Sequence, residues 1–128
     1  MSKKVIFVDD SKTVLASVEL AVEELVEAGL IEFFTFNNPV EFLAEIEANK
    51  LTYDLLFTDI NMPQMTGLEL SQKLKNIAHI RQKPILALTT ENSAEIKQLG
   101  KDIGIAGWVV KPFSNEKIVT AIKKVLGV

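Results

Sequence analysis

Hydrophobic and polar residues along this chain form two alternating patterns. Short runs of consecutive apolar residues recur five times, and each run has the length of a buried strand. The segments between the runs are too long for hairpin turns, and their apolar residues recur with the period of a helix. We therefore expect strand and helix to alternate along the whole chain. The expected strands are Val5–Val8, Ile31–Phe36, Leu55–Phe57, Ile85–Leu88 and Trp108–Val110.

Five helices are expected, one after each strand. Asn38, Pro39 and Glu41 form a typical helix start, and Gly29 is a typical helix stop. The fourth helix should be the loosest, because Gly100 within it costs about 1 kcal/mol relative to alanine. The expected helices cover residues 11–28, residues 38–49, the segment between the Met62–Pro63 turn and residue 76, residues 93–103, and the segment that follows Ser114.

This order of elements predicts an α/β fold. Continuous apolar strands are buried on both faces, which is the situation of strands in a parallel sheet. Right-handed crossovers then place helices on both sides, so a three-layer, doubly wound sandwich is expected, in one domain covering residues 1–128. Sheets of this kind bind ligands beyond the carboxyl ends of their strands, and candidate chemistry should be sought there.

Composition narrows the possible functions. No apolar run approaches the roughly 18 residues of a membrane span, so a soluble, cytoplasmic protein is expected, without a membrane partner. The chain has no cysteine and only one histidine, His79, to which we assign no role. Disulfides, thiolate nucleophiles and cysteine-based zinc sites are thereby excluded, so any bound metal should be one that prefers oxygen ligands. The mild net charge of -3 argues against a nucleic-acid partner.

The charge is divided unevenly between the two halves of the chain. Residues 1–64 contain 4 lysines and arginines against 12 aspartates and glutamates, whereas residues 65–128 contain 10 against 5. Both excesses are compatible with ordinary solvated helix faces. They are equally compatible with an acidic site in the first half and a basic partner-binding face in the second. The lysines of that hypothetical face are Lys97, Lys101, Lys117, Lys123 and Lys124.

Polar residues stand at the carboxyl ends of four of the five expected strands. They are Asp9 and Asp10 after the first strand, Asp59 after the third, Thr89 and Thr90 after the fourth, and Lys111 after the fifth. Clustered carboxylates repel one another unless a cation neutralises them, and Mg²⁺ suits such hard oxygen ligands. A metal and a lysine beside a carboxylate make a pocket suited to phosphoryl transfer, with one carboxylate as the nucleophile.

Each of these residues alone has an ordinary structural interpretation. The Asp9–Asp10 pair could cap the first helix, and Asp59 could start a turn. Thr89 could simply end a strand, and Lys111 could be a surface lysine in a loop. What favours a functional site is their joint occurrence at the same edge of the predicted sheet.

In this order, the residues resemble the receiver domains of two-component response regulators, and the resemblance covers essentially the whole chain. Within that family, the segment 89–91 and the segment 107–113 resemble the chemotaxis regulators, the CheY-like single-domain type. The resemblance implies a flavodoxin-like sheet of five strands in the order 2-1-3-4-5. The motifs that carry it are Asp9-Asp10, Asp59-Ile60-Asn61-Met62-Pro63 with Met65 and Gly67, Thr89, and Lys111-Pro112-Phe113.

The resemblance assigns roles to the acidic residues. Asp59 would be the phosphoacceptor of a histidine kinase of the CheA type. Mg²⁺, or Mn²⁺ in its place, would be bound by Asp10, Asp59 and the backbone carbonyl of Asn61, while Asp9 would act largely through metal-bound water. The side chains of Asn61 and Glu91 would flank the path of the hydrolytic water, and this pair resembles that of regulators that lose their phosphoryl group quickly.

The resemblance also implies a switch. Lys111 would bridge the phosphoryl group and the carboxylate, and the Lys111–Pro112 peptide bond would be cis, which is a minority state. Thr89 would bind the phosphoryl group and draw its loop inward. Trp108 would then swing into the vacated space and change the face formed by the fourth helix, the fifth strand and the fifth helix. Because the family more often has tyrosine or phenylalanine at this position, the swing of Trp108 could be weaker.

The expected output is binding rather than catalysis. The chain leaves no room for a DNA-binding domain or an output enzyme, so we expect a monomer that binds an output protein such as a component of the flagellar motor switch. The runner-up within the family is a phosphorelay intermediate that passes its phosphoryl group to a histidine phosphotransfer protein. A hydrolase of the haloacid-dehalogenase type is disfavoured because little chain is left for its cap, and a nucleotide or flavin module because the glycine-rich motifs are missing.

Overall fold

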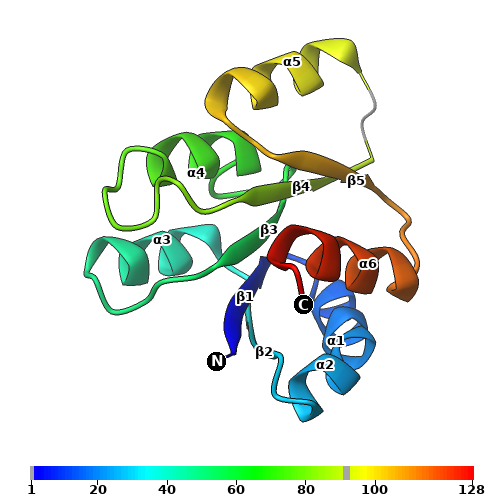
Figure 1. Ribbon diagram of the computed structural model, residues 1–128. Coiled ribbons are helices and arrows are strands. Elements are labelled where there is room, and N and C mark those ends of the chain that lie inside the picture. The colour runs from blue at the N-terminus through cyan, green and yellow to red at the C-terminus, as the bar shows by residue number, and fades with distance from the viewer. Residues whose placement is uncertain (1, 91–92) are drawn as a thin grey trace.

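The computed structural model describes residues 2–90 and 93–128, and within these residues helices connect the successive strands (Figure 1). The strands are β1 (Lys3–Val8), β2 (Ile31–Phe36), β3 (Leu55–Asp59), β4 (Ile85–Thr89) and β5 (Gly107–Val110). The helices are α1 (Lys12–Ala21), α2 (Glu23–Glu27), α3 (Pro39–Glu47), α4 (Gly67–Leu74), α5 (Ala94–Ile103) and α6 (Asn115–Leu126).

The five strands form one parallel sheet in the order β2-β1-β3-β4-β5. Helices α1, α2 and α6 cover one face of the sheet, and α3, α4 and α5 cover the other (Figure 1). The predicted three-layer fold and the strand order are both confirmed. Because the strands are in register, Val8 lies beside Thr58 and Asp59 beside Leu88, so the carboxyl ends of the central strands meet at one edge.

The core consists of two clusters, one on each face of the sheet. Alternate residues of β1 illustrate the division, since Ile6 and Val8 face α3 and α4, whereas Val5 and Phe7 face α1 and α6. These four side chains are fully buried. β2 lies at the edge of the sheet and is less buried than β1 and β3, as its polar residues predict. The central strands therefore provide a rigid base for the residues at their ends.

The number of helices differs from the prediction. The segment expected to form a single helix over residues 11–28 forms two, because Val22, with φ −99° and ψ 2°, leaves the helical conformation. There the chain tightens, and the N–H of Leu25 donates to the carbonyl of Val22, only three residues earlier. Val18, Val22 and Leu25 are all buried, so the apolar stripe continues across the break. Hydrophobic periodicity reports which side is buried, and for that reason it could not reveal the interruption.

The helix starts follow the usual capping chemistry. Ser11, Asn38, Ser93 and Ser114 each accept a hydrogen bond from a backbone N–H in the first turn of the helix that follows. Gly29 adopts a left-handed conformation with φ 73°, consistent with its predicted role as a helix stop. The third predicted helix ends at residue 74 rather than 76, because the chain then turns through hydrogen bonds that span three residues.

Helix α5 is attached to the domain differently from the others. Gly100 is its only buried residue, Ile96 and Ile103 are half-buried, and Leu99 is 51% exposed. The most buried point of α5 is therefore a residue without a side chain. None of the helices formed by the described residues is both long and apolar enough to cross a membrane.

Candidate functional site

Five of the predicted site residues lie at the carboxyl edge of the sheet. Asp9 and Asp10 immediately follow β1, Asp59 and Thr89 are the last residues of β3 and β4, and Lys111 immediately follows β5. These strands are separated along the sequence by helices, yet their ends are adjacent in space because the sheet is parallel. The topology therefore gathers at one edge residues that are up to 102 positions apart in sequence.

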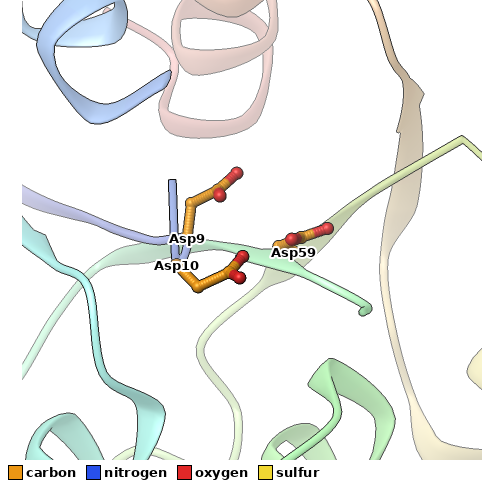
Figure 2. A group of neighbouring side chains, drawn as sticks. All are labelled: Asp9, Asp10 and Asp59. Carbon is orange, nitrogen blue, oxygen red and sulfur yellow. The ribbon is translucent and has the colours of Figure 1, made fainter. Parts of the chain in front are cut away.

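The three aspartates form a compact acidic cluster. One carboxylate oxygen from each of Asp9, Asp10 and Asp59 lies within 4.8 Å of the other two. Figure 2 shows the two side chains from the end of β1 beside that of Asp59 on β3. Asp9 is completely buried and Asp59 is 6% exposed, whereas Asp10 is exposed to solvent. The cluster is thus open on the Asp10 side and closed on the Asp9 side.

Lys111 neutralises part of this negative charge. Its Nζ lies 2.9 Å from Oδ2 of Asp9, to which it donates a hydrogen bond, and 3.3 Å from Oδ1 of Asp59. Burial alone would lower the pKa of Lys111. The hydrogen bond and charge of Asp9, together with those of Asp59, outweigh burial and raise that pKa. Lys111 therefore remains a cation in contact with two of the three carboxylates.

The pKa of Asp59 is raised above that of an ordinary aspartate. The largest cause is burial, followed by the negative charge of Asp9, and the charge of Asp10 makes a smaller contribution in the same direction. The charge and hydrogen bond of Lys111 act in the opposite direction without cancelling these effects. Lys111 alone therefore does not offset burial and the charges of the two neighbouring aspartates. Further positive charge would stabilise ionised Asp59.

Asp9 is held from two sides. Its Oδ1 accepts a hydrogen bond from the backbone N–H of Ser11 at 2.9 Å, while its Oδ2 accepts the one from Lys111. The cap of α1 is Ser11, whose Oγ accepts from the N–H of Val14 at 3.3 Å. The alternative in which the Asp9–Asp10 pair simply caps the helix is therefore wrong, and the acidic pair is available for another role.

The donor set fits a hard divalent cation. Three carboxylates within 4.8 Å of one another offer only oxygen ligands, which Mg²⁺ and Mn²⁺ prefer. After burial, the negative charges of Asp9 and Asp10 also raise the pKa of Asp59, so the cluster would accept further positive charge. The exposed side of the cluster, at Asp10, leaves room for water molecules, and Mg²⁺ usually keeps several of them. These residues are therefore suited to Mg²⁺ binding.

Other predicted positions in the described part of the chain include Thr89, Pro112 and Asn61. Thr89 is 1% exposed, and its backbone carbonyl accepts a hydrogen bond from the N–H of Lys111 at 2.9 Å. The Lys111–Pro112 peptide bond is cis. Asn61 lies in the exposed loop after β3. Glu91 lies outside the described residues.

Trp108 is half-buried on β5 and packs against the core on the α5 side of the sheet. It also lines a surface groove together with Val110 of β5 and with Lys117 and Thr120 of α6. Trp108 therefore takes part in both an interior contact and an exposed face. This is the position that a side chain needs if its movement is to change the surface.

The structure also shows supporting residues whose roles the sequence did not suggest. A Cβ atom at Gly67 would overlap the backbone carbonyl oxygen of Asp59, so only glycine allows α4 to begin so close to β3. The hydroxyl of Thr58 donates to that same carbonyl at 3.0 Å, and the hydroxyl of Ser71 donates to the carbonyl of Gly67 at 2.7 Å. Together these contacts fix the backbone at Asp59. A glycine at the first position of a helix was the one visible signal.

The basic residues of the second half do not share one groove. Lys117 lines the groove beside Trp108, between β5 and α6. Lys123 instead lines a groove between α6 and the α1–α2 segment, with Leu20 of α1 and Glu24 of α2 on its other side. The two grooves adjoin one another on α6, where both are lined by Glu116 and Thr120, and the basic face stays a prediction of which Lys117 adjoins Trp108.

Comparison with known proteins agrees with this geometry. Chemotaxis protein CheY1 of Helicobacter pylori is 30% identical over 124 residues, which cover 97% of each chain. Protein PilG of Pseudomonas aeruginosa is 28% identical over 120 residues, 94% of this chain and 84% of that protein. Among solved structures, chemotaxis response regulator CheY4 of Vibrio cholerae matches with a TM-score of 0.85 and 38% identity, over 98% of this chain and 99% of the other.

The family profile described as the response regulator receiver domain matches residues 5–123, nearly the whole chain. The sequence match, the strand order and the acidic edge of the sheet thus agree with one another. This chain belongs to the response regulator receiver domains of two-component signalling and is CheY-like.

Proposed function

We propose that this receiver domain is a single-domain chemotaxis regulator in which Asp59 is the phosphoacceptor. The observation that carries the proposal is the surroundings of Asp59. Its carboxylate is nearly buried, lies 3.3 Å from the ammonium group of Lys111, and is within 4.8 Å of two further carboxylates. A nucleophile beside a cation, at a site that favours additional positive charge, suits the capture of a phosphoryl group.

In the proposed reaction, a carboxylate oxygen of Asp59 forms a bond to phosphorus. The bond between phosphorus and the donor breaks at the same time, and the donor nitrogen or oxygen keeps the electron pair. Lys111 neutralises part of the charge that spreads over the phosphoryl oxygens. Asp10, Asp59 and the carbonyl of Asn61, with Asp9 acting through water, would hold Mg²⁺, which would supply the remaining positive charge.

The proposed output is a change of the surface around Trp108. Thr89 is buried at the end of β4 and follows Leu88, which lies beside Asp59 in the sheet register, so a phosphoryl group on Asp59 would lie near its hydroxyl. A hydrogen bond from Thr89 to that group would draw the end of β4 inward and open space for Trp108. The face formed by α5, β5 and α6 would then bind a partner such as a motor switch component, in the cytoplasm and as a monomer.

The direct test is chemical phosphorylation. The purified chain is incubated with Mg²⁺ and acetyl phosphate, and intact mass and tryptophan emission are recorded together. We expect a gain of one phosphoryl group and a change in emission, which must come from Trp108 because the chain has one tryptophan. Asp59→Asn should show neither change. Phosphorylation that persists in Asp59→Asn would overturn the assignment of the phosphoacceptor.

Two further assays separate this proposal from its alternatives. Multiple-turnover hydrolysis of small phosphomonoesters would indicate a hydrolase that uses an aspartyl phosphate intermediate. Transfer of the phosphoryl group from Asp59 to a histidine phosphotransfer protein would indicate a phosphorelay intermediate. We expect neither activity, and acceptance of a phosphoryl group from a CheA-type kinase instead.

A further inference from the structure

The ring of Trp108 is in close contact with the backbone of α5 at Gly100. A Cβ atom built on Gly100 would overlap Cζ2 of the indole and lie 3.0 Å from Cη2. It would also lie 3.4 Å from Cδ1 of Ile105, a buried residue of the segment that joins α5 to β5. The outer edge of the indole thus occupies the volume where any other residue would carry its side chain.

This arrangement accounts for a residue that is locally unfavourable. Glycine inside a helix is the poorest choice apart from proline, because it has the most conformational freedom to lose. Gly100 nevertheless lies within α5, three residues before its end at Ile103, and is the only buried residue of that helix. Its place is explained by the tertiary contact, since only glycine leaves room for an indole at this point.

The same contact connects two parts of the proposed switch. Trp108 lines the exposed groove between β5 and α6, and at its outer edge it touches α5. Leu99, the neighbour of Gly100 on α5, is largely exposed and provides little additional attachment. The Trp108 ring therefore contributes both to the groove and to the contact at the only buried residue of α5.

We propose that the space left by the missing side chain of Gly100 holds the Trp108 ring and that this contact sets the unphosphorylated state of the switch. We call this space the seat of Trp108. In the unphosphorylated protein, the space left by glycine holds the indole against α5. A side chain at position 100 would displace the ring toward the groove beside Lys117, without any phosphoryl group on Asp59. This inference rests on the proposed function for the meaning of the switch, but the seat itself is a property of the unphosphorylated fold.

The test is a double-mutant cycle in metal-free, unphosphorylated protein. It compares wild type, Gly100→Ala, Trp108→Phe and the double variant, with Lys101→Ala as a control at an exposed neighbouring position of α5. Phenylalanine lacks the outer edge of the indole, so it should leave space for the added methyl group. In the Trp108→Phe background, Gly100→Ala should therefore raise Tm by about 3 °C through helix propensity.

In the wild-type background, the same substitution should lower Tm by about 4 °C or more, because the methyl group and the indole compete for one volume. Acrylamide should also quench the emission of Trp108 more strongly in Gly100→Ala than in wild type or in Lys101→Ala. A rise in Tm in both backgrounds, or unchanged quenching, would overturn the proposal. The opposite signs in the two backgrounds cannot arise from a general loss of folding.

A final measurement separates this inference from the proposed function. Gly100→Ala is treated with Mg²⁺ and acetyl phosphate, and mass and emission are followed together. We expect a normal gain of one phosphoryl group, and an emission that differs from that of unphosphorylated wild type already before treatment, because the ring has left its seat. An initial emission equal to that of wild type would contradict the seat, whereas an absence of phosphorylation in wild type would contradict the function of Asp59 alone.

Discussion

Replacing Asp59 by asparagine should stabilise the metal-free protein and destabilise it relative to wild type when Mg²⁺ is present. Asp59 is repelled by two carboxylates within 4.8 Å and attracted by Lys111 at 3.3 Å. At an effective dielectric constant of about 20, each repulsion is about 3.5 kcal/mol and the attraction about 5 kcal/mol. The balance is unfavourable by about 2 kcal/mol, and screening at exposed Asp10 reduces it to about 1 kcal/mol.

Magnesium should make wild type more stable than Asp59→Asn. At a concentration of 100 times its Kd, a ligand that binds only the folded state stabilises it by about 2.7 kcal/mol. A variant whose Kd is about 30 times higher gains only about 0.9 kcal/mol at the same concentration. Urea unfolding followed by circular dichroism, in EDTA and in Mg²⁺, should therefore give curves that exchange their order. Equal responses of the two proteins to Mg²⁺ would refute the electrostatic argument, as would a less stable variant in EDTA.

The higher stability of metal-free Asp59→Asn relative to wild type should also depend on pH. Burial and the charges of Asp9 and Asp10 raise the pKa of Asp59 in the folded state. The cost of ionised Asp59 is thus fully present above that pKa and disappears as the pH falls toward the unfolded value of about 3.9. In EDTA, the difference in unfolding free energy between variant and wild type should shrink between about pH 7 and about pH 4. A difference that stays constant over this range would rule out Asp59 ionisation as its source.

Four other measurements test separate parts of the structure. Tyr53→Phe should raise the unfolding free energy by about 1 kcal/mol, because the buried hydroxyl has no hydrogen-bond partner among the described residues; a loss measured in urea would contradict this. Gly67→Ala should cost about 1–3 kcal/mol and slow acetyl phosphate labelling, since its methyl group would displace the phosphoacceptor backbone; unchanged labelling would contradict it. Lys117→Glu should weaken binding of the phosphorylated chain to an output partner in a titration, whereas Lys123→Glu, in the other groove, should not; equal effects would mean that the two grooves act together. The phosphoryl group should be short-lived in Mg²⁺, with Asn61 contributing to its loss; a lifetime of many hours would exclude this.

The sequence was sufficient for the architecture because the fold depends on buried patterns that are visible in it. Runs such as Leu55–Phe57 are apolar on both faces, which requires a sheet covered on both sides. The same pattern could not distinguish one helix from two around Val22, since both helices bury the same stripe. Hydrophobic periodicity therefore predicts which elements exist better than where they are interrupted.

The site could be predicted only in part, for a related reason. The predicted topology places the carboxyl ends of the strands at one edge of the sheet. This was enough to predict that Asp9, Asp59 and Lys111 lie together. Contacts that depend on close approach are not visible in a pattern. Gly100 was expected simply to weaken its helix, and its contact with the indole becomes evident only in three dimensions. For the same reason, the sequence grouped Lys117 with Lys123, which the fold places in different grooves.

The bond between Asp9 and Lys111 joins the first strand to the loop after the last one, 102 residues later. During synthesis, the acidic residues at the ends of β1 and β3 would thus leave the ribosome long before their lysine does. Until β5 docks, three carboxylates would face one another without their internal cation. A nascent chain should consequently depend on cytosolic salt and magnesium at this edge, and it should become competent for signalling only after its final strand has been added.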